Sequence, residues 1–318
     1  MTGERGLINR GLTNGGLVNG GPVNRGLVNG GLVNSGLVNR VLDFSLVDGP
    51  GNRLVIFVQG CNFDCIACHN PYTIDVCDSC GGCVEPCPDE ALSLTFDRGT
   101  PEVVVDRNVC TECDVCIEVC PINSTPLARR MEVSALLQRI GSVAPFISGI
   151  TVSGGEATRQ ADFVVDLFSA VKSTPGLDRL TTMVDTNGSA DRATWDRLAP
   201  VMDGAMVDLK ALDPELHLRM TGQDNAPVLE SIRHLAAIGK LYEVRLLMVP
   251  GHNDSAETVK RTAEWLLAVD PDMRVKLIGF RRHGVRPHHA HIAEAEPEHL
   301  AILERTLRAV GLSGVVVV

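Results

Sequence analysis

The sequence predicts an α/β fold in which parallel strands alternate with helices and a cysteine-rich lobe interrupts the series near its start. Three observations lead to this prediction. Short apolar runs typical of buried strands recur along the chain, amphipathic stretches with helical spacing lie between them, and eight of the eleven cysteines fall within residues 77–120. Strands that alternate with helices form parallel β/α units. The sequence therefore indicates a β/α core with one insertion.

The first part of the chain is of low complexity. Residues 6–40 consist of seven copies of a five-residue unit, from GLINR at the start to GLVNR at the end. Gly and Asn favour turns and flexible chain, and the unit has neither a helical nor a two-residue period. We expect residues 1–35 to form a disordered extension, with a small stacked β-structure or a partner-docking arm as the alternative.

Six apolar runs predict the strands of the core. The first, residues 54–59 (LVIFVQ), ends directly before Gly60 and Cys61 and is typical of a buried parallel strand. The others are residues 149–153, 182–185, 205–208, 243–249 and 275–278.

Helices are expected between these strands, with the first core helix near Glu132. Helical spacing of apolar residues is clearest in two stretches. They are Phe163, Val164, Leu167, Phe168 and Val171, and Leu300, Leu303, Leu307 and Val310.

Polar, glycine-rich segments follow the predicted strands. In parallel β/α folds the functional residues lie at the carboxyl ends of the strands. We therefore expect the functional site in residues 61–70, 153–158, 185–188, 208–210, 249–254 and 280–286.

The cysteines form three runs that leave none over. The run Cys61, Cys65 and Cys68 has the spacing C-x3-C-x2-C, which supplies three thiolates to a cluster of four irons and leaves one iron open. The two longer runs follow C-x2-C-x2-C-x3-C-P, the spacing by which bacterial ferredoxins hold a pair of [4Fe–4S] clusters. If the ferredoxin crossover holds, the two ligand sets are Cys77, Cys80, Cys83 with Cys120, and Cys110, Cys113, Cys116 with Cys87.

Structural zinc and disulfides are the alternatives for these cysteines. Zinc prefers four ligands in two separated pairs, whereas each longer run is one continuous quartet closed by proline. Eleven cysteines cannot all pair in disulfides, and the chain shows no cationic and apolar regions of a secretory signal. We therefore expect a reducing, cytoplasmic compartment.

Charge and hydropathy argue against two classes of partner. The formal net charge is −10 and the pI is near 5.4, so neither nucleic acid nor an anionic membrane would attract the chain. No apolar stretch approaches the about 20 residues needed to span a bilayer. With 318 residues, 44% of them hydrophobic, the chain is long enough for a full core and one satellite domain.

The three-cysteine run, followed after the next strand by a Gly-Gly-Glu segment, resembles the radical S-adenosylmethionine (SAM) superfamily. From about Gly36 onward the chain is most similar to glycyl radical enzyme activating enzymes. The motifs that carry the resemblance are FSLVDGPGNRLVIFVQGCNFDCIACHNP, SGGEATRQ, VDTNG, MVDLK, TG followed by Asn225, and RLLMVPGHND. The cysteine-rich insert and the GFRRHGVR segment are similar to the YjjW group.

This resemblance implies a domain organisation. A partial (β/α)6 TIM-type barrel would comprise residues 36–75 and 127–318, and a ferredoxin-like 2[4Fe–4S] domain would be inserted as residues 76–126. The low-complexity extension, residues 1–35, would precede both.

The resemblance also implies an activity. Members of this family reductively cleave SAM at a [4Fe–4S] cluster, here held by Cys61, Cys65 and Cys68, to a 5′-deoxyadenosyl radical. The radical abstracts a hydrogen atom from a backbone glycine of a partner, a glycyl radical enzyme. The two auxiliary clusters would pass single electrons from reduced flavodoxin or ferredoxin. Two alternatives stay open, a radical SAM enzyme that acts on a small molecule or another peptide, and an electron carrier without catalysis.

Contacts with SAM follow from the same motifs. Gly154 and Gly155 would let the backbone approach its amino group, from which Glu156 would accept hydrogen bonds. Arg245 matches a residue near its carboxylate, where a guanidinium suits bidentate recognition. Lys210 matches a further cofactor contact. An isolated SGGE would be weaker evidence, because many strand-to-helix turns carry glycines.

Two further groups match family positions. Asp185, Thr186, Met206 and Asp208 match residues around a monovalent cation beside the cofactor, although Asp208 and Lys210 alone would suit a solvated pair at a strand end. Asp48 begins the DGPG loop, residues 48–51, which in the family meets the glycine-bearing loop of the partner. Without the cluster motif, DGPG is a plain turn signature.

The chain departs from the family pattern at two positions. Ala67 stands where an aromatic residue usually lies near adenine, and Arg281 stands where relatives without the insert have histidine. His69 directly follows the last cluster cysteine and would border the cofactor or donate to a cluster sulfur. The HHAH segment, residues 288–291, is expected to be solvated rather than a metal site.

Overall fold

The structure is a computed structural model that describes residues 35–318. The expected disordered extension therefore lies outside the described residues, apart from Ser35. In the described part of the chain, no helix is long and apolar enough to cross a membrane.

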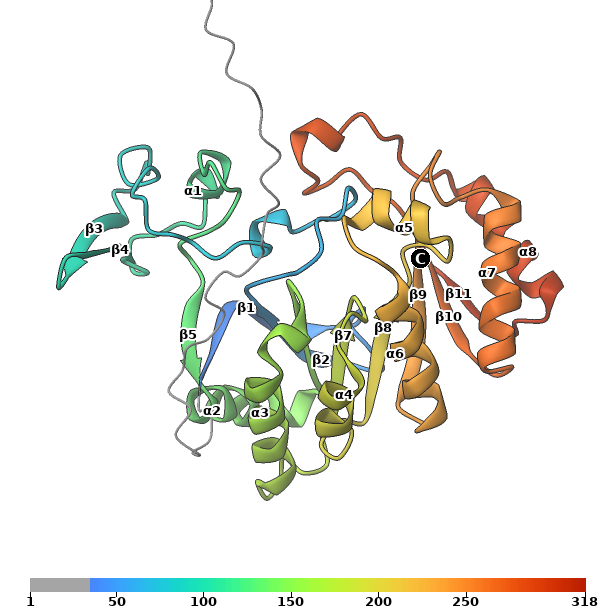
Figure 1. Cartoon of the computed structure of the whole chain (residues 1–318). Coiled ribbons are helices and arrows are strands. Elements are labelled where there is room, and N and C mark those ends of the chain that lie inside the picture. Colours follow the sequence, from blue (N-terminus) through green and yellow to red (C-terminus); the bar gives the residue numbers. More distant parts are fainter. Residues whose placement is uncertain (1–34) are drawn as a thin grey trace, which may run out of the picture. The chain divides into compact units, whose positions relative to one another are not determined.

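One sheet of nine strands organises the fold, in the order β11-β10-β9-β8-β7-β6-β2-β1-β5 (Figure 1). Seven neighbouring strands of it run parallel. They are β2 (Arg53–Val58), β6 (Gly149–Gly154), β7 (Thr181–Thr186), β8 (Gly204–Asp208), β9 (Leu241–Met248), β10 (Arg274–Gly279) and β11 (Gly314–Val317). The six predicted strands are confirmed, and β11 is an addition that extends the sheet beyond six β/α units.

The other end of the sheet is antiparallel. Strand β1 (Ser35–Ser45) pairs antiparallel with β2 and with β5 (Arg129–Glu132). The last copy of the repeat, residues 36–40, therefore belongs to the sheet. Its Gly36 needs the absence of a side chain, because a Cβ there would lie 2.5 Å from the ring of Phe163.

Helices connect the parallel strands, and neighbouring helices pack as α2 on α3, α3 on α4, α4 on α6, and α7 on α8 (Figure 1). Their bounds are α2 (Val133–Val143), α3 (Ala161–Ser173), α4 (Arg192–Leu198), α5 (Pro214–Thr221), α6 (Ala226–Ala237), α7 (Ala256–Val269) and α8 (Pro297–Val310). Short 3-10 turns are η1 (Pro71–Thr73), η2 (Ala144–Phe146), η3 (Ala157–Gln160) and η4 (Pro287–His289).

The predicted apolar faces of two helices are confirmed. All five predicted residues of α3 are buried, as are Leu300, Leu303 and Leu307 of α8, while Val310 is half-buried. Asp191, Asp213 and Ser255 start α4, α5 and α7 by accepting a hydrogen bond from a first-turn amide. The core thus lies between the sheet and these helices.

The cysteine-rich segment has elements of its own. Strands β3 (Leu92–Asp97) and β4 (Thr100–Val105) form a separate two-stranded sheet, followed by the short helix α1 (Val115–Glu118). The two ends of the cysteine-rich segment are joined at the carbonyl of Asp75. This carbonyl accepts hydrogen bonds from Gln59 Nε2 at 2.6 Å and from Ser124 Oγ at 2.7 Å.

Candidate functional site

The loop that carries the first three cysteines follows β2 and is held by backbone hydrogen bonds on two sides. The amides of Gly60 and Cys61 donate to the carbonyls of Thr73 and Ile74. Farther along, the amides of Asp64 and Ile66 donate to the last turn of α5. These backbone hydrogen bonds therefore fix the loop against η1 and α5.

All three thiols of this loop are half-buried. Burial raises the pKa of both Cys61 and Cys65 to about 12, and that of Cys68 also rises. Cys61 Sγ accepts hydrogen bonds from the Phe63 amide at 3.4 Å and Asn187 Nδ2 at 3.8 Å. Such N–H···S contacts are common around iron–sulfur clusters, where they tune the metal.

Glu156 is a buried carboxylate that ties the loops after β6 and β7 together. Its Oε1 accepts from the amide and hydroxyl of Thr158 and from Thr186 Oγ1, at 2.9, 2.6 and 2.7 Å. Its Oε2 accepts from the amide of Asn187 at 2.7 Å. Burial raises the pKa of Glu156. The predicted contact with the SAM amino group stays a prediction, beside this second role as a loop organiser.

Gly154 and Gly155 lie where another backbone passes close by. A Cβ on Gly154 would lie 2.2 Å from the Val58 nitrogen, and one on Gly155 would lie 2.4 Å from the Gly60 oxygen. The glycines are thus required for packing against the end of β2 and the start of the cysteine loop. This packing role agrees with the structural alternative for glycines in a strand-to-helix turn, and their approach to the cofactor stays a prediction.

The side chains of Asp185, Met206 and Arg245 contact one another from the neighbouring strands β7, β8 and β9. Arg245 Nη1 lies 2.9 Å from Asp185 Oδ1, Nε lies 2.8 Å from Glu243 Oε1, and Nη2 lies 2.9 Å from Met206 Sδ. Asp185 also accepts a hydrogen bond from Ser153 Oγ at 2.8 Å. Burial opposes the charge of Arg245, but the two aspartates, Asp185 and Asp208, raise its pKa above the usual value. The guanidinium thus has protein partners at each nitrogen.

Asp208 and Lys210 form an ion pair of 2.6 Å whose side chains are only 29% and 16% exposed. The pair is therefore not a solvated one at a strand end. Burial opposes the charge of Lys210, whereas Asp208, Cys65 and Cys68 raise its pKa. Lys210 thus interacts electrostatically with two of the three thiols, and its positive charge would stabilise negative charge on sulfur or on a bound anion.

Side chains from four parallel strands donate hydrogen bonds to backbone carbonyls of the DGPG loop and of Val47, the residue before it. Arg245 Nη2 and Lys276 Nζ donate to the Val47 carbonyl at 3.3 and 3.0 Å. Thr151 Oγ1 donates to the Asp48 carbonyl at 2.7 Å, and Arg53 Nη1 donates to the Pro50 carbonyl at 3.0 Å. The Asp48 carboxylate accepts from Ser45 Oγ.

Arg53 belongs to this site, although no sequence motif indicates it. It is completely buried and also donates to Thr151, Thr181 and the Ile150 carbonyl. Burial lowers its pKa to about 10. An arginine within a strand otherwise made of apolar residues was the available signal.

The positions that depart from the family pattern lie near one another. Ala67 shares a buried apolar cluster with Phe280, whose ring centroid is 6.1 Å from that of His69. His69 Nε2 is buried and has no hydrogen-bond partner among residues 35–318. Arg281 is exposed and faces Glu294 at 3.7 Å. Phe280 thus supplies the aromatic side chain beside Ala67.

The insert brings its cysteines together across the two runs. A cavity is lined by four of them, Cys87, Cys110, Cys113 and Cys116. The charge of Cys120 contributes to the raised pKa of both Cys77 and Cys83, after the larger effect of burial. Cys87 thus lines a cavity with cysteines of the other run, while the ferredoxin-type ligand sets stay a prediction.

Among residues 35–318, no three His, Cys, Asp or Glu side chains converge closely enough to hold a single metal ion. Three or four thiols bind a cubane at separate irons. The cysteine ligands thus stay predictions. In the HHAH segment, His288 and His291 are exposed and His289 is half-buried.

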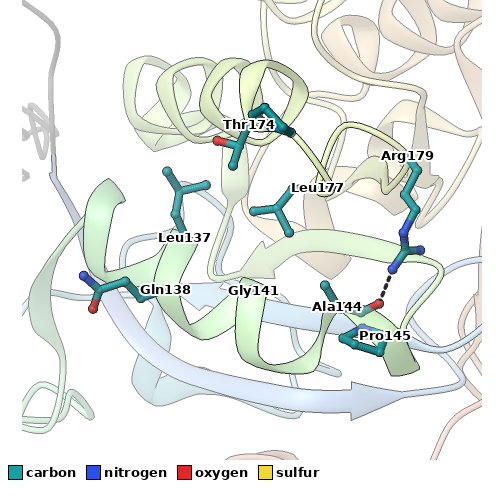
Figure 2. A pocket seen from close by; sticks show the side chains of 10 residues that line it. Leu137, Gln138, Gly141, Ala144, Pro145, Thr174, Leu177 and Arg179 are labelled. Carbon is teal, nitrogen blue, oxygen red and sulfur yellow. Dashed lines mark hydrogen bonds between the residues drawn. The ribbon is translucent and has the colours of Figure 1, made fainter.

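A surface hollow of about 520 Å³ lies away from these residues (Figure 2). Leu137, Gly141 and Ala144 line one side of it, and Thr174 and Leu177 line the other. It lies in the helical layer and includes none of the predicted site residues.

Comparison with known proteins identifies the family. Residues 55–266 match the Radical SAM superfamily. The chain is 30% identical over 247 residues to the pyruvate formate-lyase-activating enzyme of Streptococcus mutans, covering 76% of each protein. It is 34% identical over 240 residues to the benzylsuccinate synthase activating enzyme of Thauera aromatica, covering 70% of this chain and 71% of that protein.

One solved structure shows a likeness of fold alone. QueE from Escherichia coli superposes with a TM-score of 0.52 at 13% identity, covering 89% of this chain and 94% of QueE. The match to the superfamily spans the cysteine loop, the Gly-Gly-Glu segment and the strands that carry the Asp185–Arg245 pair. This chain belongs to the radical SAM superfamily.

Proposed function

We propose that this protein is a glycyl radical enzyme activating enzyme. The relatives named above are activating enzymes, and each aligns with more than two thirds of its length. The main structural support is the pair of contacts made by Arg245. This residue contacts Asp185 of the predicted cofactor site and also the Val47 carbonyl beside the DGPG loop. One side chain thus joins the predicted cofactor site to the loop expected to meet the partner.

The residues present suit a site-differentiated [4Fe–4S] cluster with SAM. Cys61, Cys65 and Cys68 would hold the cluster. His69 follows them directly, and its buried Nε2 has no partner within the described part of the chain. When bound, the cluster and SAM supply a 5′-deoxyadenosyl radical that takes a hydrogen atom from a backbone glycine. The chain itself contributes no acid or base to this step.

The work of the protein is positioning and exclusion of water. Lys210 places a positive charge beside Cys65 and Cys68, and Glu156 fixes the loops after β6 and β7 around Cys61. Arg245 would contact the carboxylate of SAM by exchanging one of its protein partners. Asp185, Thr186, Met206 and Asp208 would border a monovalent cation, and Asp48 would meet the glycine loop of the partner.

We further propose that residues 76–126 are a ferredoxin-like domain with two auxiliary [4Fe–4S] clusters, inserted between residues 36–75 and 127–318 of the barrel. The proposal is supported by the cavity of Cys87, Cys110, Cys113 and Cys116 and by the proximity of Cys120 to Cys77 and Cys83. These clusters would accept electrons from reduced flavodoxin or ferredoxin. Ligation by free thiols requires a reducing compartment, so we place the protein in the cytoplasm.

Transfer of hydrogen from a labelled partner tests the function. The protein is reduced anaerobically with SAM and a candidate glycyl radical enzyme whose glycines are deuterated. The proposal predicts deuterium in 5′-deoxyadenosine and a glycine-centred radical signal on the partner. Formation of 5′-deoxyadenosine without deuterium, with every candidate partner encoded near this protein, would instead favour a small-molecule substrate.

A further inference from the structure

The loop that follows β10 is closed at its base and packed on its inner side. The Phe280 carbonyl accepts a hydrogen bond from the Ala295 amide at 3.0 Å, so the two ends of residues 281–294 lie together, as in an Ω-loop. Phe280 and Ile292 are buried, at 0% and 4% exposure, and both belong to the apolar cluster that contains Ala67 of the cysteine loop. The inner side of this loop is therefore packed on the cysteine loop.

The same loop contacts the cysteine loop at two polar points. A Cβ on Gly284 would lie 2.2 Å from the His69 carbonyl oxygen, and the φ of Gly284, +76°, is one that favours glycine. Arg286 forms an ion pair with Asp64, from its Nη2 to the carboxylate Oδ1. The loop after β10 therefore reaches both ends of the segment that carries the second and third cysteines.

Arg286 differs from the two other arginines of this loop. Its side chain is only 15% exposed, whereas Arg281 and Arg282 are exposed. Arginine is rarely covered to this degree without a paired charge, and Asp64 supplies that charge. Burial raises the pKa of Cys68, and the charge of Arg286 is one of those that oppose this rise. Arg286 thus lies at the contact between the two loops and acts on a predicted cluster ligand.

We propose that residues 280–292 form a cover over the cluster of the three-cysteine loop, called the first cluster here, and that Arg286 is the positioning residue that latches this cover loop to Asp64. A site closed to water protects reactive intermediates from side reactions. The inference rests on the proposed function, because it requires a cluster at the three cysteines after β2. It adds the segment that shields this cluster and the contact that keeps the segment in place.

Hydrogen–deuterium exchange of the iron-loaded protein under anaerobic conditions tests the latch. In Arg286→Met, peptides that cover residues 61–70 and 280–292 should exchange at least about threefold faster, because a partly exposed ion pair is lost. Asp64→Asn should have the same effect. The double variant should exchange no faster than either single variant, because both substitutions remove the same contact.

Arg282→Met is the matched control. Arg282 is exposed in the same loop, and its contact with Glu294 Oε1 at 3.0 Å is made by the backbone amide, which the substitution keeps. Exchange in both segments should stay at the wild-type rate in this variant. Unchanged exchange in Arg286→Met, or equal exchange in Arg286→Met and Arg282→Met, would overturn the latch.

The rate at which a hydrophilic chelator removes iron tests the cover. Three four-iron clusters give about twelve irons per chain, and about four of these belong to the first cluster. About four irons should leave Arg286→Met at least about threefold faster than the wild type, while the other irons leave at the wild-type rate. Faster exchange without faster loss of these four irons would overturn the cover.

A separate iron measurement distinguishes this inference from the proposed function. If the first cluster exists, Cys68→Ala should hold about four irons fewer than the wild type. When that difference is present, failure of the latch or of the cover overturns this inference only. When it is absent, the proposed cluster site is overturned, and the cover with it.

Discussion

Lys276 offers a selective way to loosen the DGPG loop. Its Nζ donates to the Val47 carbonyl at 3.0 Å, a shorter contact than the 3.3 Å from Arg245. Lys276→Met keeps most of the side-chain stem and removes only the ammonium group. Arg245, the buried cluster around Asp185 and the cysteine loop remain unchanged.

The expected size follows from this single contact. A partly solvated hydrogen bond contributes about 1 kcal/mol, which corresponds to about a fivefold change in a local opening equilibrium. Hydrogen–deuterium exchange of peptides covering residues 44–52 should therefore accelerate about fivefold in Lys276→Met. The KM for the partner enzyme should rise, while 5′-deoxyadenosine formation without the partner stays at the wild-type rate.

Lys240 provides the matched control. Its Nζ donates to the Met202 carbonyl at 2.7 Å, so Lys240→Met also removes a lysine bonded to a backbone oxygen, but outside the loop. Exchange in residues 44–52 should be unaffected in this variant. If exchange there is the same in Lys276→Met as in the wild type, the carbonyl contacts do not hold the loop, and the reasoning is wrong.

Three further changes test other parts of the account. Arg53→Met should lower the free energy of unfolding by about 3 kcal/mol in a denaturant titration. The variant loses five hydrogen bonds, and this loss is partly offset because a cation is no longer buried. A decrease of less than about 1 kcal/mol would contradict this reasoning. Gly155→Ala should reduce bound iron by about four atoms per chain, because the new Cβ would collide with the Gly60 carbonyl. Gly141→Ala is the control, since a Cβ there has nothing within 4 Å, and this variant should keep its full iron. Equal iron contents in the two variants would refute the packing argument. Cys68→Ala should abolish 5′-deoxyadenosine formation under chemical reduction, whereas Cys83→Ala should retain it, and loss in both would mean that the clusters do not act separately.

The sequence predicted six of the seven parallel strands, because apolar residues dominate most of them and those of β2 and β6 are buried on both faces. It missed β11 (Gly314–Val317), even though three of its four residues are valines. A run of only four residues carries little periodic signal. It also missed β1 and β5. The last repeat unit, GLVNR, closely resembles the units before it, and it becomes a strand through pairing with both β2 and β5.

The sequence predicted which residues lie at the site better than it predicted the contacts between them. Cys61, Glu156, Asp185 and Arg245 do lie on neighbouring loops and strands, since strand order alone brings carboxyl ends together. The sequence contained no sign that Glu156 and Arg245 are already saturated by protein groups. Those bonds depend on side-chain reach across strands.

The clamp on the DGPG loop illustrates the same limit. Thr151 and Lys276 are separated from the loop by about a hundred residues or more, and neither belongs to a recognisable motif. Their contacts with backbone carbonyls leave no trace in residue type, because any donor of the right length would serve.

Mössbauer spectroscopy of protein reconstituted anaerobically with ⁵⁷Fe, recorded before and after addition of SAM, tests the central claim most directly. If Cys61, Cys65 and Cys68 leave one iron of their cluster free for SAM, about one iron in twelve should change its isomer shift and quadrupole splitting. A spectrum that stays identical when SAM is added, in protein carrying its full iron, would contradict the account.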